Sequence, residues 1–136
     1  MKIPNNIRPN FFSLLAWSVL LLYAVVGKSQ TLDTVFTCQG TFMDEGGATG
    51  DYLSNQHRVI TYCPDQEGFS RLQLYALDLA PGDFIKVFDG ADTTAPLLKV
   101  LNSQAQQLPY TFQAAAQNNS RCLTLQFFSD AQGTAA

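Results

Sequence analysis

LQLYALDLAPGDFIKVFDG, residues 72–90, decides the fold of this chain. Leu72 and Leu74 share one face of an alternating run, and residues 84–88 alternate in the same way. A period of two is typical of β-strands. Ala80-Pro-Gly-Asp83 separates the two runs and predicts a tight turn, because proline presets φ and glycine supplies a positive φ. The stretch therefore predicts two strands joined by a short connection.

The rest of the chain beyond residue 30 repeats this pattern and shows no helical period. β-branched and aromatic residues predict further strands at Val35–Thr37, Arg58–Tyr62, Leu97–Leu101, Pro109–Gln113 and Leu123–Phe128. Many short strands without crossover helices indicate an all-β fold, an antiparallel sandwich of two sheets.

Residues 1–29 have the three parts of a secretory signal peptide. Lys2 and Arg8 form a basic start, residues 11–26 are almost entirely apolar, and small residues precede a cleavage site after Ser29. An uncleaved membrane anchor is the alternative, although a spanning helix needs about 20 apolar residues. We expect cleavage, no membrane insertion afterwards, and a protein that is secreted or held at the cell surface.

The expected mature segment, residues 30–136, is long enough for one small domain with a single core. Five basic against eleven acidic side chains give it a net charge of −6. Nucleic-acid binding requires clustered lysine and arginine, so this composition argues against a nucleic-acid partner.

An odd number of cysteines needs an explanation in an exported chain. The three are Cys38, Cys63 and Cys122. Cys38 and Cys63 could close a loop of moderate length, which would leave Cys122 without a partner. That partner could lie beyond residue 136, or Cys122 could be a buried thiol or form an intermolecular bridge. The wide spacing and the single histidine argue against zinc.

An ordered series of motifs resembles a CUB domain of the type found in exported bacterial proteins. The series begins with Cys38, Gly40–Gly47, Gly50-Asp-Tyr52 and Cys63-Pro64. It continues with Leu72–Leu79, Asp83-Phe-Ile-Lys-Val-Phe-Asp-Gly90 and Leu123-Thr-Leu-Gln-Phe-Phe-Ser-Asp130. The resemblance spans about residues 36–133, which is nearly all of the expected domain.

The resemblance implies a jelly-roll-like sandwich and a disulfide between Cys38 and Cys63. It leaves Cys122 unpaired or without its partner, because a final strand introduced by a glycine–aromatic pair is missing. We therefore expect the domain to be truncated before its last strand. The loss of an edge strand would leave backbone groups unpaired.

Many domains of this family bind calcium at one end of the sandwich. The resemblance places two of the family's ligands at Asp83 and Asp130, whereas Ala80 replaces a glutamate ligand. Calcium takes 6–8 oxygen ligands, so a missing carboxylate weakens such a site. The alternative is that both aspartates are turn residues that accept hydrogen bonds from nearby backbone.

Other polar residues give weaker indications. Asp44, Glu45 and Asp51 lie in a glycine-rich loop without EF-hand spacing, which favours solvated acids over a metal site. His57 borders a predicted strand and is the only histidine, which favours a structural role over catalysis.

These observations predict a non-catalytic extracellular module that binds protein or glycan, with possible calcium support, within a larger exported protein. Two alternatives stay open. One is an accessory domain of a secreted protease or other hydrolase whose catalytic domain lies downstream. The other is a small standalone structural protein.

Overall fold

The computed structural model describes residues 31–37, 39–44, 46–47, 50–105 and 108–132. The predicted signal peptide lies outside these residues. Within the described part, no helix is long and apolar enough to cross a membrane.

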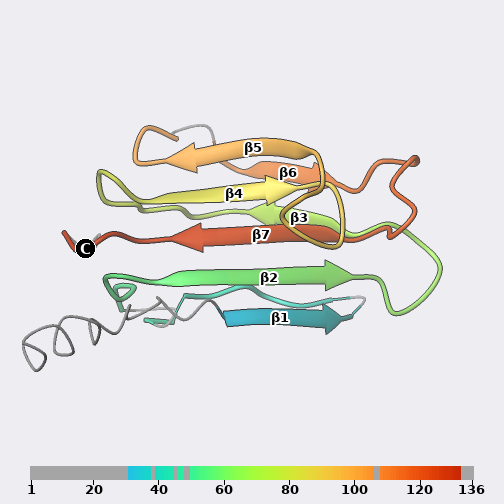
Figure 1. Cartoon of the computed structure of the whole chain (residues 1–136), viewed down its shortest axis with the longest axis horizontal. Helices are drawn as coiled ribbons and strands as arrows, with labels where there is room; N and C mark the ends of the chain where they lie inside the picture. Colours follow the sequence, from blue (N-terminus) through green and yellow to red (C-terminus); the bar gives the residue numbers. More distant parts are fainter. Residues whose placement is uncertain (1–30, 38, 45, 48–49, 106–107, 133–136) are drawn as a thin grey trace, which may run out of the picture.

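The described residues contain seven strands in two stacked sheets, as the alternation predicted (Figure 1). They are β1 (Thr31–Phe36), β2 (His57–Cys63), β3 (Arg71–Leu74), β4 (Phe84–Phe88), β5 (Leu97–Asn102), β6 (Tyr110–Gln113) and β7 (Leu123–Phe128). The larger sheet has the order β1-β2-β7-β4-β5, and β3 pairs with β6 in the smaller sheet.

The expectation of a wholly antiparallel sandwich is wrong at one edge. β1 pairs with β2 in parallel, whereas the other four pairings are antiparallel. Parallel neighbours need a long connection, and residues 37–56 supply it. The periodicity of β1 could predict a strand, but it contains no information about the direction of its partner.

The turn at residues 80–83 forms as predicted. The backbone N–H of Asp83 donates to the carbonyl of Ala80 at 3.1 Å, and Gly82 has a φ of +102°. The preceding strand is shorter than the alternation suggested, because β3 ends at Leu74. Beyond it Tyr75 and Ala76 are exposed, and the chain crosses irregularly to the turn.

The core lies between the two sheets. Ile85, Val87, Leu125 and Phe127 cover the inner face of the larger sheet, and Leu74 meets them from the smaller one. On the outer face, the loop after β4 folds over the end of β2 and the start of β7. The hydroxyls of Thr61 and Thr124 donate there to the carbonyls of Ala91 and Gly90, at 3.2 and 2.8 Å.

The second sheet covers only part of the first. In Figure 1, β3 and β6 lie behind the half of the larger sheet that contains β4 and β5. The other half, formed by β2 and β1, has no strand of the smaller sheet behind it. The irregular segment that follows β1 runs there instead.

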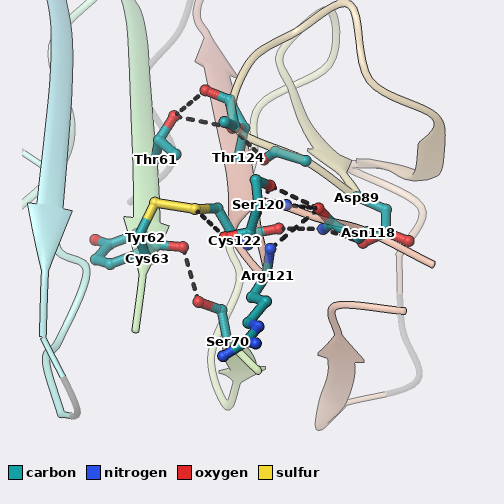
Figure 2. The surroundings of a disulfide bond; sticks show 12 residues. Thr61, Tyr62, Cys63, Ser70, Asp89, Asn118, Ser120, Arg121, Cys122 and Thr124 are labelled. Carbon is teal, nitrogen blue, oxygen red and sulfur yellow. Dashed lines mark hydrogen bonds between the residues drawn. A yellow bond between two sulfur atoms is a disulfide. The ribbon is translucent and has the colours of Figure 1, made fainter. Parts of the chain in front are cut away.

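The expected disulfide between Cys38 and Cys63 is wrong, and so is the expectation that Cys122 lacks a partner. Figure 2 shows Cys63 bonded to Cys122, with their Cα atoms 4.3 Å apart. The register of β2 and β7 pairs Tyr62 with Leu123, so the two cysteines lie directly opposite each other one position further along. Cys38 lies outside the described residues.

Hydrogen bonds hold the chain around this disulfide (Figure 2). The side-chain amide of Asn118 donates to a carboxylate oxygen of Asp89 at 2.7 Å and to the carbonyl of Cys122 at 2.8 Å. The hydroxyl of Ser70 donates to the carbonyl of Tyr62 at 2.8 Å. The bonds of Asn118 join the end of β4 to the start of β7, and the bond of Ser70 joins the start of β3 to the end of β2.

Peptide mapping under non-reducing conditions tests this pairing. Trypsin cleaves after Arg58, Arg71 and Arg121, so each cysteine falls in a different peptide. We expect mass spectrometry to find residues 59–71 linked to residues 122–136. A link between residues 59–71 and the peptide that contains Cys38 would contradict the structure.

Removal of the disulfide should also lower stability. The bridge joins residues separated by 59 positions. In the chain-entropy model, the double variant Cys63→Ala/Cys122→Ala loses about 4 kcal/mol of unfolding free energy. Urea unfolding of the variant and the oxidised parent measures this difference.

Candidate functional site

The two predicted calcium ligands meet at the end of the sandwich opposite the disulfide. Asp83 is 1% exposed, and its two carboxylate oxygens have different partners. One accepts the backbone N–H of Asp130 at 2.8 Å, and the other accepts the hydroxyl of Tyr52 at 2.5 Å. The chain therefore brings Asp83 and Asp130 together.

Tyr52 completes this arrangement. Its hydroxyl accepts the backbone N–H of Ala80 at 2.7 Å while it donates to Asp83. Its ring contacts Phe127 edge-on, with centroids 5.1 Å apart. The sequence indicated Tyr52 only as the end of the Gly50-Asp-Tyr52 motif, because nothing in the local pattern identifies a partner that lies 31 positions away.

The neighbouring residues close the same end. The hydroxyl of Ser129 is fully buried, accepts the N–H of Gln56 and donates to the carbonyl of Leu53, both at 2.8 Å. The N–H of Asn55 donates to the carbonyl of Asp130 at 2.7 Å. These bonds tie the segment before β2 to the end of β7.

This arrangement fits calcium poorly. No group of three or more metal-ligating side chains occurs in the part of the chain that the structure describes. Both oxygens of Asp83 already accept hydrogen bonds. A calcium shell of 6–8 oxygens would need several further ligands. The calcium expectation stays a prediction, and the observed bonds are those of aspartates that stabilise turns.

The other polar candidates with described contacts have partners other than Asp83. Asp44 accepts the N–H of Gly46 at 2.9 Å within the glycine-rich loop, Asp51 is exposed, and Glu45 lies outside the described residues. The ring of His57 contacts Phe128 edge-on and lies 2.8 Å from the side-chain amide of Gln126. These contacts are those of residues that stabilise a turn or the packing of neighbouring strands.

Substitution of Tyr52 tests the importance of the buried hydroxyl. Tyr52→Phe leaves an oxygen of Asp83 and the N–H of Ala80 without this partner, which should cost about 1–3 kcal/mol of unfolding free energy. Tyr75→Phe is the matched control, because its exposed hydroxyl bonds only the side chain of Gln73. Its loss should stay below about 0.5 kcal/mol. Equal losses in urea unfolding would contradict the structural role given to Tyr52.

Sequence reasoning missed a large concave surface among the described residues. A cavity of about 910 Å³ opens beside β3, over β7 and the neighbouring parts of β2 and β4. Its two walls are residues 70–79 and residues 39–44. We call this cavity the β3 groove. No local motif indicates it, because it results from the unequal widths of the two sheets.

The floor of the β3 groove is apolar. Leu123 and Phe127 of β7 line it together with Ile85 of β4 and Tyr62 of β2. The first three are buried at the base of the groove, and Tyr62 is half-buried. Burial raises the pKa of the Tyr62 phenol, with Arg58 lowering it and Asp33 raising it by smaller amounts. Tyr62 therefore stays uncharged at neutral pH. Met43 and Phe69 add partly exposed apolar surface to the lining.

The charged residues of the groove are mostly acidic. Four carboxylates line it, and Arg71 is the one basic side chain among the described lining residues. The four are Asp44, Asp65, Glu67 and Asp78. All but Asp44 are exposed, so the groove combines an apolar floor with a solvated negative rim.

A scan against protein-family models and a search of curated proteins found no match to this chain. The function is therefore inferred from the groove, the sandwich and the sequence.

Proposed function

We propose that this chain is a non-catalytic, exported module that binds a protein or glycan outside the cell. The β3 groove is the observation that supports this proposal. Ligand sites are typically concave and largely apolar, with a few polar groups that set orientation. The groove has this composition, and its volume of about 910 Å³ falls within the range of such sites.

The surrounding structure suits a binding role. Strands β4 and β7 supply the floor, and their hydrogen-bonded pairing holds Ile85 opposite Phe127. The Asp83–Tyr52 bonds and the disulfide hold the two ends of the sandwich. A groove on such a scaffold needs little ordering when a ligand binds, which preserves affinity.

Two double variants with matched exposure test the proposal. Met43 and Phe69 line the groove and are 49% and 43% exposed, whereas Leu97 and Leu98 lie outside it and are 51% and 41% exposed. Because all four are partly solvated, serine at these positions should change stability little.

The exported chain is screened on a glycan array and against a displayed library of random peptides. We expect at least one library to yield a ligand. Its affinity should fall about tenfold in Met43→Ser/Phe69→Ser and remain unchanged in Leu97→Ser/Leu98→Ser. No ligand from either library, or equal losses in both variants, would overturn the proposal.

A further inference from the structure

We propose that the β3 groove binds an extended peptide as an added β-strand along β3, with apolar side chains alternating with lysine or arginine. This inference rests on the proposed function and specifies the ligand and its mode of binding. Three features of the groove support it: a free strand edge, an apolar floor and an acidic rim.

The first feature is the backbone of β3. Its register with β6 pairs Leu72 with Phe112, and the carbonyl of Ser70 accepts the N–H of Ala114 at 2.9 Å. Backbone groups of successive strand residues point to opposite sides. The N–H and C=O of Arg71 and Gln73 therefore point away from β6 and into the groove. Among the described residues, no strand pairs with this side of β3.

The second feature is the direction of the side chains. Leu72 and Leu74 of β3 pack toward the core, whereas Arg71 and Gln73 are exposed. An added strand would continue this pleat, with alternate side chains on the apolar floor and on the solvent side. Peptides that join a sheet edge in this way gain affinity from main-chain hydrogen bonds and specificity from pockets for alternate side chains.

The third feature is charge. The solvent-facing side chains of the added strand would lie near Asp65, Glu67 and Asp78. Arg71 lies in the lining, and Arg58 and Arg121 stack on the lining rings of Phe42 and Phe69. Lysine or arginine at those positions would complement the rim, and acidic side chains would be repelled. A neutral glycan has no peptide backbone to pair with the free strand edge and no cationic groups to pair with the carboxylates. The observations therefore favour a basic, alternating peptide.

The direct probe is a capped, fluorescent peptide of alternating valine and lysine, with binding to the exported chain measured by anisotropy. Three control peptides separate the features. One has the same composition in two blocks, one replaces lysine by glutamate, and one is N-methylated along one backbone edge. We expect only the alternating, unmethylated lysine peptide to bind well. Equal binding of the block or N-methylated peptide would overturn strand addition.

A pair of proline substitutions locates the edge that is used. Gln73→Pro removes an N–H that faces the groove and keeps the bonds between β3 and β6. Thr111→Pro is the matched control, because Thr111 lies opposite Gln73 and its N–H faces the far side of β6. Proline is tolerated where a strand edge faces outward. We expect about tenfold weaker binding in Gln73→Pro and a change below about twofold in Thr111→Pro.

Charge and hydrogen exchange provide two further measurements. Glu67→Gln/Asp78→Asn should weaken binding about threefold to tenfold at low salt, and Asp92→Asn, outside the groove, should not. The amides of Arg71 and Gln73 should exchange rapidly in the free protein and slowly in the complex. Protection of these amides in the free protein would show that the chain itself covers the edge, and would overturn the proposal.

The outcomes separate this inference from the proposed function. A groove ligand from the array or library, combined with no binding of the alternating peptide, would refute strand addition and leave the binding module standing. Loss of every ligand would refute both.

Discussion

The pairing of β7 with both β2 and β4 is the constraint on which the rest of the structure depends. β7 lies in the middle of the larger sheet, and its inner side chains Leu125 and Phe127 belong to the core. One end of β7 adjoins Cys122, bonded to Cys63, and the other continues into Ser129 and Asp130. One strand thus aligns the sheet, the disulfide and the closed end of the sandwich.

The buried polar groups follow from this alignment. Asp83 is almost fully buried, and burial of a carboxylate is costly without hydrogen-bond donors. The hydroxyl of Tyr52 and the backbone of Asp130 supply two donors, and each is delivered by a different part of the chain. Among the described residues, no buried side-chain polar atom lacks a partner. The two aspartates therefore stabilise the junction between strands, whether or not an ion also binds.

The groove follows from the unequal sheets. Five strands present more inner surface than two strands can cover, so apolar side chains such as Leu123 contribute to a cavity beside β3. The irregular stretch after β3 and the segment after β1 form walls instead of a further strand. The proposed binding site therefore lies beside the free edge of β3, where Met43 and Phe69 expose apolar surface.

The sequence by itself determined the all-β class, the positions of most strands and the turn at residues 80–83, because alternation and turn chemistry are local properties. Only the tertiary structure decided the parallel direction of β1, the end of β3 at Leu74, the partner of Cys63, the bond from Tyr52 to Asp83 and the β3 groove. Each of these depends on register or contact between residues far apart in the chain. A local pattern states which side chains share a face, but contains no information about which strand that face meets.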